Sequence, residues 1–351
     1  MRSRGTMGEA RTRMDSFEYH TAASLCPEGA RTCRRTSFLG ASGRAPRALF
    51  FYMREVVVLI AHGTVNSLDE LPEFVREIRR GRPAPPGLIE ELRARYERVG
   101  GSPLLTLTSE LAAKVAEASG LETRVAMRLW NPRFVDVTRD LGPGERVILV
   151  PLAPFSVPVY AAAAERELAS QKRAPELVVV DAYGSSVELI DAWARGIAGA
   201  LGAPGTEAGK TAVVCTAHSL PSAVIKAGDP YEREFRLSAA QVFERLRELG
   251  YAGISMHVAF QSQGAGEGEW LGPTLAETLG ALEPGTRACV APIGFLSDHI
   301  ETLYDLDIEA AEQARALGLR WVRAPALNLD EGLVRALIEA VEGARARAEA
   351  P

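Results

Sequence analysis

Short apolar runs alternate with amphipathic segments along most of this chain, and that alternation restricts its fold more than any other feature. VVVLIA (56–61), RVILVPLA (146–153) and TAVVCTAHS (211–219) are mostly continuous apolar runs. Such runs are typical of strands that are covered on both faces in a parallel sheet. Segments with helical periodicity, such as 186–201 and 231–249, lie between them. Strands that alternate with helices predict an α/β fold built on parallel sheets.

The opening strand pattern recurs in the second half of the chain. VVVLIAHGT begins at residue 56 and TAVVCTAHS at residue 211, and their apolar runs end in Ala-His, at His62 and His218. We therefore predict two similar Rossmann-like lobes. Ligands of such sheets bind beyond the carboxyl ends of the strands. His62, His218 and Gln261 stand at predicted strand ends and should face a cleft between the lobes.

The predicted organisation has four parts. Residues 1–53 contain nine Arg, no Lys and no sustained apolar periodicity. We expect them to be a disordered tail or a spurious extension, with Met53 as the natural start. Residues 54–175 should form the first lobe and 176–325 the second. Residues 326–351 should form a helix that packs across to the first lobe.

Composition excludes several classes of protein. The net charge of −5 and the pI near 5.7 argue against nucleic-acid binding as the main role. No apolar run reaches the roughly 18–20 residues of a transmembrane helix. The four cysteines, Cys26, Cys33, Cys215 and Cys289, do not make a disulfide framework, and their spacings match no zinc or iron–sulfur site. A reducing cytoplasm is the expected location.

A stripe of acidic residues begins where a strand ends, in GFLSDHIETLYDLDIEAAEQA. Helical spacings of three and four place these carboxylates on one face. Like charges at such spacings destabilise a helix by roughly 0.2–0.5 kcal/mol per pair. The stripe is either a solvated face or a site for cations at the predicted cleft. Its members are Asp298, Glu301, Asp305, Glu309 and Glu312.

Several segments together resemble the ferrochelatase family, and the resemblance extends from residue 56 to the C-terminal helix. The most specific segments are TAHSLP (216–221) and PIGFLSDHIETLYDLDIE (292–309). The others are GDPY (228–231), FQS…EWLGP (260–273), IRRGRP (78–83) and RYERVGGSPL (95–104).

The resemblance implies a chelatase-like fold that inserts Fe²⁺ into a porphyrin bound between two Rossmann-like lobes, as a lyase of haem biosynthesis. His218 would bind the metal and accept pyrrole protons, and Glu301 would face it. Imidazole with carboxylate suits Fe²⁺. Asp305 and Glu309 would extend the line of metal-binding carboxylates. The residues expected to contact the porphyrin are His62, Arg79, Arg80, Tyr160, Ser219, Gln261 and Trp270.

Some points of the resemblance leave alternatives open. Related coproporphyrin-using enzymes often have Tyr where this chain has His62, which is either an axial ligand or a hydrogen-bonded strand-end residue. The porphyrin is coproporphyrin III or protoporphyrin IX. The first lobe of this chain lacks the long apolar lip of membrane-associated ferrochelatases, and in this it resembles the soluble type of ferrochelatase. We expect no iron–sulfur cluster and no permanently bound cofactor. A regulatory divalent cation is compatible with the family resemblance. Transient contacts with neighbouring haem-pathway enzymes are compatible with it as well.

Two rival functions share these residues. One is a chelatase for another metal or tetrapyrrole, such as cobalt, because the small chelatases have a related fold. The other is a haem-binding carrier without catalysis that uses His62 and His218 as axial ligands.

Overall fold

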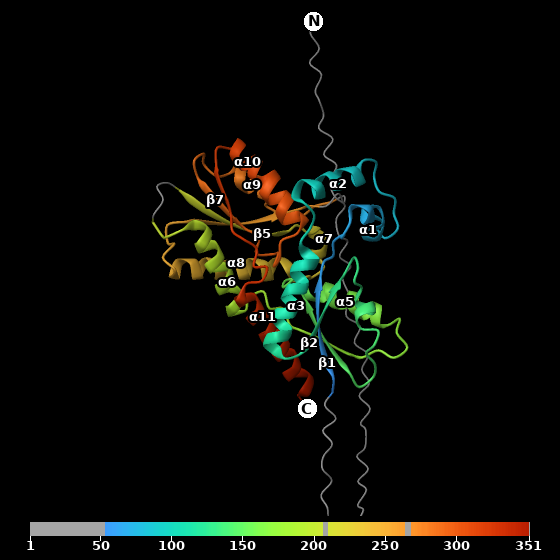
Figure 1. Ribbon diagram of the computed structural model, residues 1–351. Helices are drawn as coiled ribbons and strands as arrows, with labels where there is room; N and C mark the ends of the chain where they lie inside the picture. The colour runs from blue at the N-terminus through green and yellow to red at the C-terminus, as the bar shows by residue number, and fades with distance from the viewer. Residues whose placement is uncertain (1–52, 206–209, 264–267, 351) are drawn as a thin grey trace, which may run out of the picture.

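Two parallel four-stranded sheets form the centre of the protein in a computed structural model, which describes residues 53–205, 210–263 and 268–350 (Figure 1). The strand order is β2-β1-β3-β4 in the first sheet and β6-β5-β7-β8 in the second, so the two lobes repeat one topology. This confirms the predicted α/β fold with two similar lobes. The strands are β1 (Glu55–Ala61), β2 (Glu122–Met127), β3 (Arg146–Pro151), β4 (Glu176–Val179), β5 (Thr211–His218), β6 (Ser255–Gln261), β7 (Arg287–Ala291) and β8 (Arg320–Arg323).

Helices cover the sheets and connect their parallel strands. A 3₁₀ turn, η1, precedes α1, and a π-helix, η2, runs directly into α10. The helical elements are η1 (Leu68–Glu70), α1 (Leu71–Ile78), α2 (Leu88–Val99), α3 (Leu104–Ser119), α4 (Phe134–Val137), α5 (Val157–Leu168), α6 (Val187–Leu201), α7 (Ser222–Lys226), α8 (Tyr231–Glu248), α9 (Leu275–Gly280), η2 (Glu301–Ala310), α10 (Ala311–Ala316) and α11 (Glu331–Glu349).

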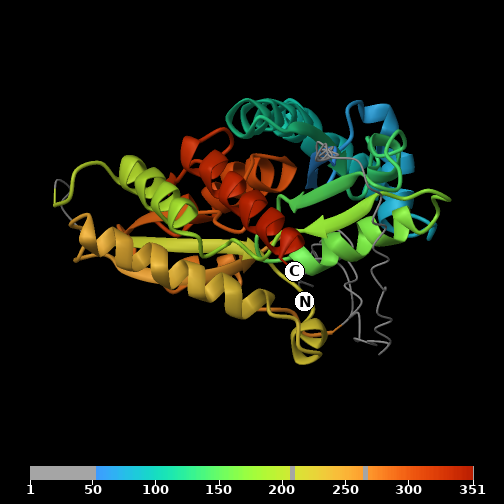
Figure 2. The same cartoon turned by 90° about the horizontal axis from the view of Figure 1, so that it is seen from below.

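The lobes exchange helices across their boundary. Helix α6 follows a strand of the first sheet but packs against α8 and strands β7 and β8 of the second lobe. Helix α11 follows the last strand of the second sheet and packs against α6, α3, β3 and β4, so it lies between the lobes (Figure 2). Its apolar face is buried through Leu333, Leu337 and Val341. The same hydrophobic cluster includes residues of both sheets, so the two lobes share a continuous core.

The first lobe is longer than its sequence predicted. Strand β4 pairs in parallel with β3, so the first sheet extends to Val179 and passes the predicted boundary between residues 175 and 176. The chain then enters the second lobe at α6, which places the crossing within residues 180–186. The predicted tail, apart from Met53, lies outside the described residues.

Two helical segments depart from a regular α-helix. The segment from Leu68 is a 3₁₀ turn followed by α1, with Pro72 in the first turn, where its missing N–H is not needed. Ser67 and Glu70 form a capping box at the start of the 3₁₀ turn. The acidic segment from Glu301 is a π-helix, a rare form that occurs often at functional sites.

Candidate functional site

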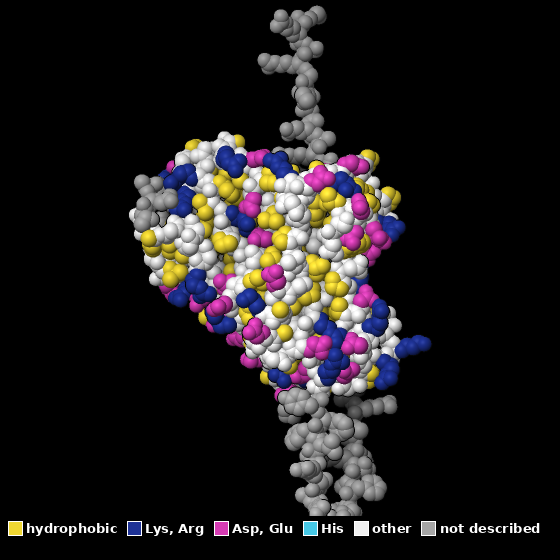
Figure 3. All heavy atoms as spheres, viewed as in Figure 1, with side chains coloured by type: hydrophobic (Ala, Val, Ile, Leu, Met, Phe, Trp, Pro, Cys, Tyr) yellow, Lys and Arg dark blue, Asp and Glu magenta, His cyan; other side chains and the backbone are white. Residues whose placement is uncertain are grey.

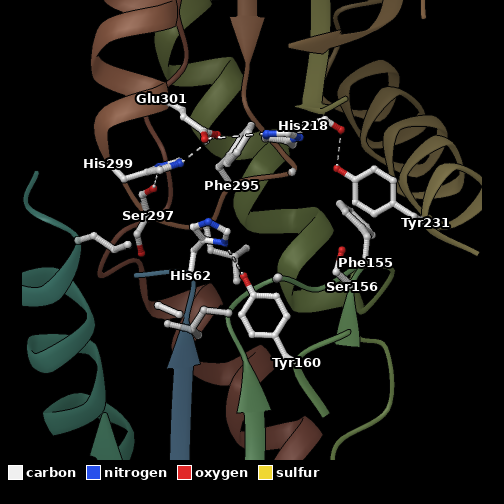
Figure 4. A pocket seen from close by; sticks show the side chains of 16 residues that line it. His62, Phe155, Ser156, Tyr160, His218, Tyr231, Phe295, Ser297, His299 and Glu301 are labelled. Atoms are coloured by element: carbon white, nitrogen blue, oxygen red, sulfur yellow. Dashed lines mark hydrogen bonds and ion pairs between the residues drawn. The ribbon is translucent and has the colours of Figure 1, made fainter. Parts of the chain in front are cut away.

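A pocket lies between the lobes where strands of both sheets end. His62 follows β1 and lines one wall, while His218 at the end of β5 lines another (Figure 4). The loop from Gly294 to the start of η2 contributes Glu301. The space inside the pocket and its mouth is about 750 Å³. The predicted meeting of strand ends at one cleft is therefore present.

The ring of His218 is oriented by its own backbone neighbourhood. Its Nδ1 lies 2.6 Å from the carbonyl oxygen of Ser219, and the hydroxyl of Tyr231 donates to the His218 carbonyl at 2.9 Å. A carbonyl only accepts, so Nδ1 carries a proton and donates it. In the neutral ring, Nε2 then offers its lone pair to the pocket. This is the form that can bind a metal or accept a proton.

Glu301 lies between two imidazoles. Its Oε1 is 3.9 Å from His218 Nε2, and its Oε2 is 3.6 Å from His299 Nε2. His299 donates from Nδ1 to the carbonyl of Ser297 at 3.1 Å, which directs Nε2 toward the carboxylate. The carboxylate thus faces a catalytic candidate on one side and a supporting imidazole on the other.

The two imidazoles keep Glu301 ionised although it is buried. Burial works against the carboxylate charge, but the charge of His218 when that ring is protonated, together with the hydrogen bond and charge of His299, lowers the pKa of Glu301 to about 2. Burial also works against a charged His299, yet its hydrogen bond with Glu301 leaves the pKa of His299 raised. Glu301 can therefore present a full negative charge to a cation in the pocket.

A polar clamp fixes the loop that leads into η2. Asp298 accepts from Arg323 at 3.0 Å and from the amide of Asn328 at 2.8 Å, and its backbone N–H donates back to Asn328. Gly294 packs against the end of β5, where a Cβ would lie 2.5 Å from that of Ala217. A larger residue at 294 would push the loop away from His218.

His62 is held by side chains of its own lobe. Arg128 Nη2 lies 3.4 Å and the hydroxyl of Tyr160 3.5 Å from His62 Nδ1, and the guanidinium lies 5.0 Å from the centre of the Tyr160 ring. Burial, and then the charge of Arg128, lower the pKa of His62 well below its ordinary value. His62 is accordingly neutral in the pocket.

The next two carboxylates of the stripe face the first lobe. Asp305 accepts from Ser262 at 2.6 Å and lies 3.4 Å from Arg95 of α2, which also lies 3.6 Å from Glu309. Burial, and then the nearby charge of Glu301, raise the pKa of Asp305 to about 7. The stripe is therefore solvated only in part: Glu301 and Asp305 are largely buried, whereas Glu309 and Glu312 are about half exposed.

The described residues contain no three His, Cys, Asp or Glu side chains that converge to hold a metal ion. The predicted ligands His218, Glu301, Asp305 and Glu309 are instead spread from the pocket along η2.

The structure brings together only some of the residues predicted to contact the porphyrin. His62 and Tyr160 line the pocket, as do His218 and Glu301. The other five do not line the pocket. Arg79 and Arg80 lie after α1, and Gln261 is the last residue of β6. Ser219 is buried and its hydroxyl donates to the Leu271 carbonyl, while Trp270 forms an antiparallel β-bridge with Pro221.

Sequence reasoning missed two polar residues of the site. Arg128 was not singled out because its contact with His62 depends on the pairing of two strands. Tyr231 belongs to GDPY, one of the segments that carry the family resemblance, and its hydroxyl donates to the carbonyl of His218. A polar residue just after an apolar strand, as Arg128 is, was the available signal.

The surface adds little to the assignment of function. On the face drawn in Figure 3, Lys and Arg side chains are interspersed with Asp and Glu over both lobes. None of the helices in the described ranges has the length and apolarity to cross a membrane.

Comparison of the sequence with known proteins identifies close relatives of this chain. A sequence model described as Ferrochelatase matches residues 54–345. A ferrochelatase of Acidobacterium capsulatum is 34% identical over 320 residues, covering 85% of this chain and 96% of the relative. One of Thermus thermophilus is 33% identical, covering 82% and 98%. A coproporphyrin III ferrochelatase of Geobacillus kaustophilus is 31% identical, covering 81% and 94%.

Two solved structures share the fold. SirB from Bacillus subtilis, solved with Fe³⁺, has a TM-score of 0.53 and 12% identity, covering 85% of this chain and 98% of its own. CbiX, the terminal enzyme for biosynthesis of siroheme in denitrifying bacteria, has a TM-score of 0.52 and 16% identity, covering 82% and 98%. Both likenesses concern the two-lobed α/β architecture.

Proposed function

The chain belongs to the ferrochelatase family, and on that premise we propose that its interlobe pocket inserts Fe²⁺ into a propionate-bearing porphyrin with His218 as the base. The observation that carries the proposal is the arrangement of His218 and Glu301, whose facing atoms are 3.9 Å apart in one pocket. A neutral imidazole and a carboxylate form a donor set that suits Fe²⁺.

The reaction replaces two protons by one dication. Two pyrrole N–H bonds break, Fe²⁺ forms bonds to the four ring nitrogens, and two protons leave. The Nε2 lone pair of His218 accepts a proton from the ring, because Nδ1 already donates to Ser219. A positioned base of this kind accelerates proton transfer by about 10²–10⁴-fold. The proton then passes to solvent, which frees the imidazole for the second proton.

Glu301 supplies the charge that draws the metal to the ring. It stays ionised in a buried place, so its attraction for a dication is screened less than at a surface. Asp305 and Glu309 extend the acidic path outward along η2. We propose that iron reaches the pocket along these carboxylates, exchanging water for oxygen ligands stepwise. A regulatory divalent cation on the same residues stays an expectation.

The porphyrin itself occupies the space between His62, Tyr160 and the loop from Gly294. Its ring must bend so that nitrogen lone pairs leave the plane, and binding energy from the rest of the substrate supplies that distortion. Arg79 and Arg80 lie after α1 and do not line the pocket, and they stay candidates for propionate contacts. We also propose a cytoplasmic location, which the free thiols of Cys215 and Cys289 support.

The test is an anaerobic assay of Fe²⁺ insertion with coproporphyrin III and protoporphyrin IX side by side. Turnover of either porphyrin that falls at least about 100-fold in His218→Ala supports the proposal. The same assay with Co²⁺ addresses the cobalt chelatase alternative. Haem binding without turnover of any metal would favour the carrier function and overturn the proposal.

A further inference from the structure

The pairing of β1 with β2 places Arg128 beside His62. The last pair of the parallel ladder is Ala61 with Met127, and the hydrogen-bond pattern continues one step further, from Arg128 N–H to the Ala61 carbonyl at 2.9 Å. Gly63 follows at φ 119°, where a Cβ would lie 3.1 Å from the Trp130 backbone nitrogen. The contact between Arg128 and His62 is thus built into the backbone.

Arg128 decides which nitrogen of His62 carries the proton. A guanidinium can only donate, so His62 Nδ1, 3.4 Å from Nη2, accepts with its lone pair. The Tyr160 hydroxyl can donate to the same atom. The ring is neutral, because burial and Arg128 disfavour its charge. A neutral imidazole has one proton, which is therefore on Nε2.

His62 and His218, two of the three imidazoles that line the pocket, consequently have opposite hydrogen-bonding roles. His218 donates from Nδ1 to Ser219 and presents a lone pair at Nε2, whereas His62 accepts at Nδ1 and presents an N–H at Nε2. They come from different lobes and line different walls of one pocket (Figure 4). A ligand that binds between them meets an acceptor on one side and a donor on the other.

A free-base porphyrin has the complementary polarity. Two of its ring nitrogens carry protons, and the other two have lone pairs. When the ring bends, donors and acceptors tilt toward opposite faces. We propose that His62 donates a hydrogen bond to the unprotonated ring nitrogens, and that Arg128 is the positioning residue that keeps His62 in this form. The inference rests on the proposed function, since it assumes a porphyrin in this pocket.

Two consequences follow for substrate and product. The removable protons face His218, which accepts them, and their departure leaves lone pairs directed toward Glu301 and the incoming metal. In the metallated product, all four nitrogens bind the metal, so His62 loses its acceptor. Its N–H also cannot bind iron, since a metal ligand needs the lone pair. His62 therefore favours the substrate over the product and does not act as an axial ligand.

The first experiment compares affinities of the full chain for coproporphyrin III and its zinc complex, or for the protoporphyrin IX pair if that is the porphyrin turned over. Fluorescence titration should show that His62→Leu weakens binding of the free base by about 10-fold, a typical value for one lost hydrogen bond to a buried group. Zinc porphyrin binding should hardly change. His62→Gln keeps an N–H donor and should restore the preference. Equal losses for both ligands would overturn the proposal.

The second experiment tests the tautomer of His62 through the axial ligands of bound ferric haem. In the wild type, the haem complex should lack the low-spin absorption and EPR signals of two axial imidazoles. The double variant Arg128→Met with Tyr160→Phe removes both donors to Nδ1, so His62 Nε2 can become a ligand and the low-spin signals should appear. Adding His62→Leu should abolish them, and Arg128→Lys with Tyr160 intact should resemble the wild type. A low-spin signal in the wild type that depends on His62 would refute the inference.

Iron insertion by the wild type separates the two proposals. A wild type that turns over iron while His62→Leu leaves the ligand preference unchanged contradicts only the role of His62. Conversely, a wild type that inserts no metal but shows the predicted preference and haem spectra contradicts only the proposed function. Melting temperatures of all variants, measured alongside, identify those that fold.

Discussion

His218 Nε2 lies 3.9 Å from Glu301 Oε1, and this contact joins the end of β5 to the first residue of η2. It exists because Gly294 lets the intervening loop pack on Ala217, and because His299 holds the far side of the same carboxylate at 3.6 Å. The proposed base and the proposed metal ligand therefore share one buried place, as proton removal coupled to metal entry requires.

The first prediction concerns these two residues. His218→Ala should lower kcat for metal insertion by at least about 100-fold, because the general base is lost. Glu301→Gln should also lower it severely, since it keeps the shape and loses the charge. Stopped-flow fluorescence of porphyrin consumption measures both. The control is His257→Ala: His257 in β6 contacts the Ser255 hydroxyl and does not line the pocket, so kcat should stay unchanged. Near-normal turnover in folded His218→Ala would remove it as the base.

The two lobes and the pair His218 and Glu301 could be predicted because the sequence features that indicate them are local. Periodicity reveals a buried strand such as β1 from its own residues, and the recurrence of Ala-His at His62 and His218 indicates a repeated lobe. Motifs that identify a family carry His218 and Glu301 with them. None of these signals depends on the packing of distant segments.

The features that could not be predicted depend on packing between segments that are distant in the sequence. Arg128 reaches His62 only through the β1–β2 register, which alternation of apolar residues does not define. Spacing also placed Asp298 in line with Glu301, but η2 begins at Glu301, and Asp298 turns instead to Arg323 and Asn328. Both differences arise from contacts between segments far apart in the chain.

The second prediction concerns the charged contact that ties α11 to the first sheet. Glu55 is 7% exposed and bonds Arg146 at 2.9 Å and Arg345 of α11 at 2.8 Å. Glu55→Gln should lower the free energy of unfolding by roughly 3 kcal/mol, because two guanidiniums lose their shared carboxylate and the buried Arg146 keeps only the half-exposed Glu176. Urea titration followed by circular dichroism measures it. Glu176→Gln is the matched control: it also pairs with Arg146 but is 49% exposed, so its loss should stay below about 1 kcal/mol. Equal effects would contradict the argument.

The third prediction is a pH dependence of stability without metal. The pKa of Asp305 is raised to about 7 in the folded protein, above its ordinary value near 4. The folded state thus binds a proton that the unfolded state has lost between about pH 4 and 7, and this contribution to stability disappears as the pH rises through that window. Asp305→Asn removes the free-energy cost of ionising this carboxyl in the folded protein. Its melting temperature in chelator should exceed that of the wild type at pH 8, with a smaller difference at pH 5. A constant difference would mean that Asp305 does not titrate in this range.

The last prediction separates a path for iron from an ordinary ion-pair network along η2. Asp305 and Glu309 share Arg95, so a dication that enters must compete with one guanidinium, and the two carboxylates offer it oxygen ligands near the pocket. Replacing both, as Asp305→Asn with Glu309→Gln, should raise the KM for iron by roughly 10-fold. The KM for porphyrin should change little, because neither residue lines the pocket. Glu312→Gln is the control on the neighbouring turn: Glu312 is 56% exposed and pairs with Arg98, so its loss should leave both constants unchanged. If the porphyrin KM rose as much as the iron KM, the double variant would be acting through the shape of the cleft, and these carboxylates would serve only to join η2 to α2.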